Sequence, residues 1–184
     1  MASNTRQQLE GWLKTLEVEG SVIDLGGLFW PVKGRTKTWN VPRYAIFDIK
    51  KSRNGVTAEF TGDLNDPVEV PEKFNNAFIL ETLNHIYDPI QCFKNINKML
   101  LPYGEVVGSV HFLFPHHSGL DCLRYTQDGV RKILEKTGFE MKTIVPKWAM
   151  WPEALNEFCT LESKVYRHPG EIGYVFSATK IRGL

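Results

Sequence analysis

Short apolar runs alternate with amphipathic stretches along the chain of 184 residues. Near the N-terminus, apolar side chains recur at helical spacing and a glycine follows them: Leu9, Trp12, Leu13, Leu16 and then Gly20. This pattern predicts an amphipathic helix within residues 1–20. Strand-sized runs follow at residues 22–25, 44–51 and 56–64, and a fourth begins at Asn75. Each is rich in β-forming residues and ends in polar residues or glycine, which predicts a strand.

The second half of the chain continues the alternation. A helical apolar face runs through residues 88–101, and Asp88-Pro89 supplies an N-cap followed by proline at the first helical position. We then expect a strand at residues 105–114, a helix capped by Thr126 and closed by Gly138, and two last strands at residues 139–145 and 172–181. An aromatic insertion at residues 146–170 separates these two strands. The alternation predicts an α/β fold with a largely parallel sheet, in a single domain over residues 1–184.

Composition narrows the class of protein. Hydrophobic residues make up 42% of the chain, charged residues 23%, and the net charge is +1. We therefore expect no nucleic-acid partner, and no apolar run reaches the ~20 residues of a membrane span. The N-terminal residues lack the pattern of a secretory signal. Three widely spaced cysteines, Cys92, Cys122 and Cys159, predict reduced thiols in a cytoplasmic protein.

Acidic residues stand at the ends of the early predicted strands. The first strand ends in Asp24-Leu25-Gly26-Gly27, the second at Asp48, and the third at Asp63-Leu64. Ligands of such sheets bind outside the carboxyl ends of the strands. A carboxylate only accepts hydrogen bonds, so Asp48 suits a ribose diol, Asp63 an exocyclic amine and Asp24 an ammonium. The set suits an adenosine with an amino-acid tail.

A dinucleotide suits this pattern less well, because the loop after the first strand has neither the GxGxxG pattern nor the lysine of a P-loop. A nicotinamide-dependent oxidoreductase is therefore disfavoured. Each residue also has a purely structural interpretation. The glycine pair could form a tight strand-to-helix turn, Asp48 could be a solvated acid beside Lys50 and Lys51, and Asp63 could belong to a turn. Their order at consecutive strand ends favours a common site.

Five motifs occur in order over residues 21–145, and the first is the strand and glycine loop described above. They are Val22 to Gly27, Phe74-Asn75-Asn76-Ala77, Leu83-Asn84-His85-Ile86-Tyr87-Asp88-Pro89, Lys98 to Gly104, and the set Pro115, His116, His117, Asp121, Arg124-Tyr125-Thr126, Gly129 and Gly138-Phe139. In these motifs the chain resembles the class I S-adenosylmethionine-dependent methyltransferases of the type 11 group. The resemblance implies a Rossmann-like seven-stranded sheet, mostly parallel, with helices on both faces and the last strand antiparallel.

The resemblance also implies S-adenosylmethionine as cofactor. Carried over position by position, the cofactor contacts are Asp24, Gly26, Gly27, Asp48, Asp63 and Leu64, with Leu80 and Glu81 beside the reactive end. The chain departs from the family at Leu28, where the next family glycine stands, and at Asn75, where an acid is usual. We expect these departures to bear on catalysis more than on fold, because Leu28 reaches positive-φ conformations less readily and its side chain could narrow the space beside the methionine part.

Histidines follow the fifth predicted strand, on the side expected for a substrate. His111, His116 and His117 are available near neutral pH, and we take His116 and His117 as the candidate base for a hydroxyl acceptor. The alternative is that they are loop or packing residues. A metal site formed by His116, His117 and Asp121 is weakly specified, and we expect no metal.

These observations lead to two hypotheses. The first is a methyltransferase acting on a small-molecule or glycan-like acceptor, at a hydroxyl. The second is a non-catalytic binding or assembly module with the same fold and a degenerate cofactor loop. The aromatic insertion at 146–170 could form a substrate lid or a homodimer surface, or simply cover the sheet.

Overall fold

The structure is a computed structural model that describes residues 4–116, 119–149 and 170–183. Its main sheet has seven strands in the order β5-β2-β1-β6-β7-β9-β8. Strands β5, β2, β1, β6 and β7 pair in parallel, and β9 is antiparallel to both β7 and β8. This is the predicted Rossmann-like sheet, with an antiparallel last strand.

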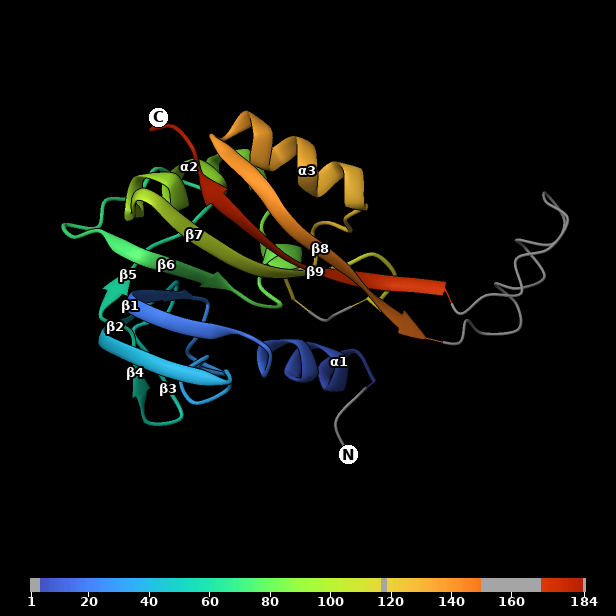
Figure 1. Cartoon of the computed structure of the whole chain (residues 1–184), viewed down its shortest axis with the longest axis horizontal. Coiled ribbons are helices and arrows are strands. Elements are labelled where there is room, and N and C mark those ends of the chain that lie inside the picture. Colours follow the sequence, from blue (N-terminus) through green and yellow to red (C-terminus); the bar gives the residue numbers. More distant parts are fainter. Residues whose placement is uncertain (1–3, 117–118, 150–169, 184) are drawn as a thin grey trace, which may run out of the picture.

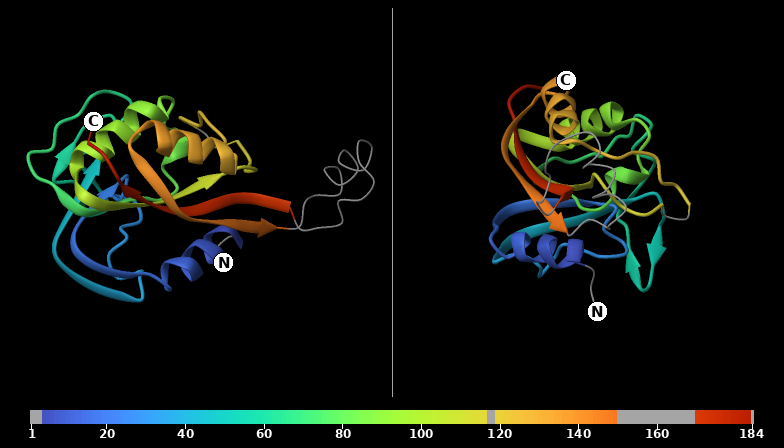
Figure 2. Two further views of the ribbon diagram at one scale, coloured as in Figure 1. Left: turned by 45° about the horizontal axis from the view of Figure 1, so that its top comes forward. Right: turned by 90° about the vertical axis from the view of Figure 1, so that its right-hand side faces the viewer.

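The elements in chain order have the following bounds: α1 Asn4–Leu13, β1 Glu17–Leu25, β2 Thr38–Asp48, β3 Ser52–Arg53, β4 Val56–Thr57, β5 Phe60–Thr61, β6 Phe74–Ile79, the 3₁₀ turn η1 Leu83–His85, α2 Pro89–Met99, β7 Leu100–His111, α3 Gln127–Lys136, β8 Phe139–Ala149 and β9 Gly170–Lys180. Helices α2 and α3 lie on one face of the sheet and α1 on the other (Figures 1 and 2). None of the helices in the described ranges is long and apolar enough to cross a membrane.

Two apolar layers hold the sheet between the helices. The larger lies between the sheet and helices α2 and α3 and contains Phe93 of α2 with Phe74 and Phe176 of the sheet. The smaller joins Leu9 and Leu13 of α1 to the opposite face. Burial on both faces explains why the central strands read as nearly continuous apolar runs. Both predicted helix caps form: Asp88 accepts a hydrogen bond from the Gln91 amide (2.9 Å), and Thr126 accepts one from the Gly129 amide (3.1 Å).

Several predicted boundaries are wrong. Gly20 does not stop a helix: α1 ends at Leu13, and Gly20 lies inside β1 at φ +80°, where the register with β2 shifts. A Cβ at position 20 would lie 2.5 Å from the Asn75 side-chain oxygen. Glycine therefore allows the strand to bulge here and to pack closely against Asn75.

The predicted strand at residues 56–64 is divided. Val56–Thr57 folds back on Ser52–Arg53 as a separate two-stranded hairpin, and only Phe60–Thr61 join β2. Further differences are smaller. Strand β2 ends at Asp48 and not at residue 51, and β7 runs from Leu100 to His111 where residues 105–114 were expected. Residues 146–149, expected in the insertion, continue β8. The predicted insertion therefore shortens to residues 150–169, which lie outside the described residues together with His117.

Candidate functional site

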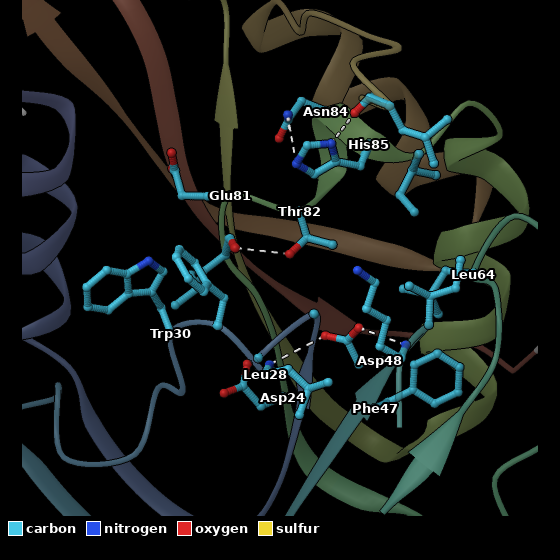
Figure 3. Close-up of a pocket in the computed structure, with 18 of the residues that line it drawn as sticks. Asp24, Leu28, Trp30, Phe47, Asp48, Leu64, Glu81, Thr82, Asn84 and His85 are labelled. Carbon is cyan, nitrogen blue, oxygen red and sulfur yellow. Dashed lines mark hydrogen bonds between the residues drawn. The ribbon is translucent and has the colours of Figure 1, made fainter. Parts of the chain in front are cut away.

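A cavity of about 1200 Å³ lies at the carboxyl ends of β1, β2, β5 and β6. All eight predicted cofactor contacts line it: Asp24, Gly26, Gly27, Asp48, Asp63, Leu64, Leu80 and Glu81. In Figure 3, Phe47, Asp48 and Leu64 lie on one side of this cavity and Trp30 and Glu81 on the other. The sheet order explains this arrangement, because the strand ends follow one another along a single edge.

The glycine loop closes tightly against its neighbours. Gly26 has φ +78°, and a Cβ there would lie 2.4 Å from the Thr82 hydroxyl oxygen. A Cβ at Gly27 would lie 2.4 Å from the Asp24 carboxyl carbon. Both positions therefore require glycine. Residues 26–37 form turns without a helix, so the tight strand-to-helix turn considered from the sequence is not what forms here.

Asp24 is 2% exposed and anchors the loop that follows the glycines. Its Oδ2 accepts hydrogen bonds from the Val32 amide and the Tyr44 hydroxyl, each at 2.7 Å. Burial raises the pKa of Asp24 from 3.8 to about 6, although both hydrogen bonds act in the opposite direction. Since both bonds end on Oδ2, the second carboxyl oxygen can accept from a cationic group in the cavity.

Asp48 and Asp63 are oriented by local turns. Asp48 accepts from the Lys50 amide at 3.1 Å and from the Leu28 amide at 3.4 Å. Asp63 Oδ1 accepts from both the backbone and the side-chain amide of Asn65, at 2.9 and 2.8 Å. These contacts fix the carboxylates without neutralising them, which leaves them able to accept from ribose hydroxyls and an exocyclic amine.

Leu28 does not adopt a positive φ, and its side chain is 2% exposed. It packs in a small cluster with Ile46 and Ala58 beside the glycine loop. The residue that replaces the family glycine is thus a packing residue, although it also borders the cavity. Asn75 lies at the amino end of β6, away from the cavity at the carboxyl ends of the strands. Its side-chain oxygen accepts from the Ser21 amide at 2.9 Å, so an amide in place of an acid at this position does not affect the cavity.

The mouth of the cavity contains two exposed aromatic side chains. Phe29 is 48% exposed and Trp30 is 58% exposed. The Arg53 guanidinium lies 4.0 Å from the Phe29 ring centroid, and Arg6 of α1 lies 4.8 Å from that of Trp30. Such cation–π contacts hold aromatic rings in place while leaving ring surface open to a ligand. The sequence did not identify Arg6 as a site residue, because its place depends on how α1 docks.

Glu81 is the centre of a buried polar cluster at the cavity wall. Its Oε1 accepts from Ser109 Oγ (2.6 Å) and Lys147 Nζ (2.8 Å), and its Oε2 accepts from His111 Nε2 (2.7 Å). Although burial acts to raise it, the His111 hydrogen bond and the Lys147 charge hold the pKa of Glu81 well below its usual value. No motif or spacing in the sequence identifies Lys147 or Ser109 as a site residue.

The motif around Arg124 is structural. The Tyr125 hydroxyl donates to the Leu83 carbonyl at 2.9 Å, and Arg124 pairs with Asp121. Together with the Thr126 cap, these contacts hold the chain before α3 against η1. His116 of the same stretch is exposed and does not line the cavity. The roles of His116 and His117 as a base stay a prediction, and across the described ranges no three potential metal ligands gather.

The sequence matches no protein-family model, and no curated protein is significantly similar to it. Its structure is similar to the S-adenosylmethionine-dependent methyltransferase of Mesorhizobium loti, with TM-score 0.63, 15% identity and coverage of 95% of this chain and 97% of that one. A Haloferax volcanii protein solved in complex with the methyltransferase activator Trm112 is similar with TM-score 0.64 and 16% identity, and the match covers 97% of this chain and 90% of that one. The StiE O-methyltransferase is similar with TM-score 0.59 and 14% identity, and the match covers 96% of this chain and 74% of that one.

Identities this low establish the fold alone. The chain has the class I S-adenosylmethionine-dependent methyltransferase fold, as the motifs in its sequence predicted.

Proposed function

We propose that this protein is an S-adenosylmethionine-dependent methyltransferase that acts on a hydroxyl of a small-molecule or glycan-like acceptor. The observation that supports it best is the set of three carboxylates, Asp24, Asp48 and Asp63, which border one cavity at the ends of β1, β2 and β5. Each has an acceptor oxygen oriented by neighbouring amides or hydroxyls. A dinucleotide site is less well supported, because the loop after β1 lacks the GxGxxG pattern that brings a pyrophosphate close to the backbone.

The residues present fit this cofactor. Asp48 would hold the ribose hydroxyls, Asp63 the adenine amine with Leu64 against the ring, and Asp24 the ammonium of the methionine part. Gly26 and Gly27 let the backbone approach closely, since neither position has room for a Cβ. The cofactor supplies an activated methyl group on a sulfonium when it is bound. The protein then has to hold and orient the two reactants and exclude water.

The size and rim of the cavity support a second ligand. Its volume of about 1200 Å³ exceeds the roughly 300–1,000 Å³ typical of a single ligand site. The exposed rings of Phe29 and Trp30 suit the flat face of an aromatic ring or of a sugar. The similarity to an O-methyltransferase also supports a hydroxyl as the methylated group.

Titration calorimetry with S-adenosylmethionine and S-adenosylhomocysteine tests this function. We expect both to bind, and Asp63→Asn to weaken binding about tenfold, because a charge-assisted hydrogen bond is replaced by a weaker neutral one. Asp66→Asn is the matched control, since Asp66 is an exposed acid three positions away that does not line the cavity. If neither ligand binds at millimolar concentration, the enzyme hypothesis is wrong and the non-catalytic module takes its place.

A further inference from the structure

The Glu81 cluster lies on the acceptor side of the cavity. Along the sheet edge the order of strands is β5, β2, β1, β6 and β7, so Asp63, Asp48, Asp24, Glu81 and His111 follow one another. The first three suit the adenosine and ammonium ends of the cofactor. His111, on the next strand beyond Glu81, therefore borders the part of the cavity left for the acceptor.

The backbone at Glu81 indicates that this arrangement is held under strain. Glu81 has φ +54°, a conformation that non-glycine residues rarely adopt. Its amide donates to Ser109 Oγ at 2.8 Å, and the same hydroxyl donates to the Glu81 carboxylate at 2.6 Å. Strained residues that the surroundings hold so firmly cluster at functional sites.

The charges around His111 fix the tautomer of its ring. Nε2 faces the Glu81 carboxylate at 2.7 Å and must carry a hydrogen. Lys147, which is 1% exposed, already balances the charge of this carboxylate from 2.8 Å, so the ring is not needed as a cation. Arg6 adds further positive charge near Glu81.

The second ring nitrogen has no partner in the described part of the chain. His111 is 5% exposed, its ring stacks on Phe114, and Nδ1 is buried without a hydrogen bond. A hydrogen on Nδ1 would be a buried donor without an acceptor, which is more costly than a bare lone pair. The neutral ring with hydrogen on Nε2 and a lone pair on Nδ1 meets these constraints best.

We propose that His111 is the proton acceptor in methyl transfer to a hydroxyl, and that Glu81 and Lys147 position it; this proposal rests on the proposed function. As the acceptor oxygen bonds to the methyl carbon, the sulfur–carbon bond breaks and its electron pair stays on sulfur. The hydroxyl proton moves to His111 Nδ1. The positive charge lost from sulfonium thus appears on the imidazolium, where Glu81 stabilises it. This assignment replaces the candidates His116 and His117.

The tautomer can be measured without cofactor or acceptor, by ¹⁵N NMR of the full chain with labelled histidine. His111→Gln identifies the resonances, because it removes this ring alone. At pH 7.5 we expect a protonated Nε2 and an unprotonated Nδ1. In Lys147→Met the Glu81 carboxylate loses its cationic partner, and we expect a larger fraction of doubly protonated His111 ring. A hydrogen on Nδ1 of the wild-type ring overturns the proposal.

Turnover provides the second test, measured as S-adenosylhomocysteine formed with a panel of phenols and sugars. His111→Gln keeps an N–H donor for Glu81 but lacks the Nδ1 lone pair, so we expect kcat to fall about 100-fold while KM for S-adenosylmethionine stays nearly constant. An unchanged kcat in His111→Gln overturns the proposal. The proposal is also overturned if His111→Gln stays active while His116→Gln or His117→Gln loses activity. Absence of S-adenosylmethionine binding by the wild type contradicts the proposed function instead, whatever the tautomer.

Discussion

Replacing Asp24 with asparagine should stabilise the protein at neutral pH. The carboxyl group is buried, and its pKa is raised from 3.8 to about 6. A raised pKa in the folded state means that folding favours the protonated group, so its contribution to stability is greatest below pH 3.8. Stability from this group is then lost as pH rises toward 6 and stays lost above it.

The magnitude follows from the two pKa values. A rise of roughly two units corresponds to about 3 kcal/mol at pH 8 and about 0.6 kcal/mol at pH 4. Asparagine has no charge to bury, and its amide oxygen can accept both hydrogen bonds that now come from Val32 and Tyr44. The free energy of unfolding of Asp24→Asn should therefore exceed that of the wild type by up to about 3 kcal/mol at pH 8. The same substitution should weaken S-adenosylmethionine binding, since the carboxylate for its ammonium is lost.

Urea unfolding at pH 4, 6 and 8 gives the difference between the two proteins. Glu140→Gln, which removes an exposed carboxylate from β8, is the matched control for loss of one charge. Burial of the Asp24 charge does not limit stability if Asp24→Asn is less stable than the wild type at pH 8, or if the difference between them does not change from pH 4 to pH 8.

Three further substitutions test other contacts. Gly27→Ala forces a Cβ to within 2.4 Å of the Asp24 carboxyl carbon. Thermal melts should therefore show a lower stability, and calorimetry should show a lower affinity for S-adenosylmethionine. Wild-type values in both measurements would contradict the close approach. Leu28→Ala removes a buried side chain and should lower the free energy of unfolding by about 3 kcal/mol in urea, whereas a cost below about 1 kcal/mol would mean that the side chain is not packed. Lys147→Met leaves the partly buried Glu81 carboxylate without its cation and should lower the free energy of unfolding by up to about 3 kcal/mol. Adding Glu81→Gln should recover part of this loss. Equal stability of the wild type and Lys147→Met would exclude the ion pair.

Local signals in the sequence predicted the parts of the fold that local interactions decide. Asp88-Pro89 and Thr126 mark helix starts because their side chains cap the nearby amides. The acids after the early strands were found because strand order places the carboxyl ends at one edge. The prediction failed at residues 56–64, where alternation indicates one strand but the Asn54-Gly55 turn folds Val56–Thr57 back on the preceding residues.

The Glu81 cluster could not be predicted, because it is assembled from distant elements. In β8 a strict alternation would place Lys147 with Thr143 and Val145, which are exposed. The pairing with β9 is unbroken from Thr143 to Lys147, so alternation does place them on one face. Lys147 is nevertheless 1% exposed, because its ammonium contacts Glu81 at the end of a different strand. Contacts of this kind depend on how β6, β7 and β8 come together.

A crystal structure with S-adenosylhomocysteine is the most direct test of the site. We expect the ribose hydroxyls at the Asp48 carboxylate, the adenine amine at Asp63 with its ring on Leu64, and the ammonium group beside Asp24. A ligand bound in this cavity without contact to Asp48, or bound elsewhere on the protein, would contradict the account.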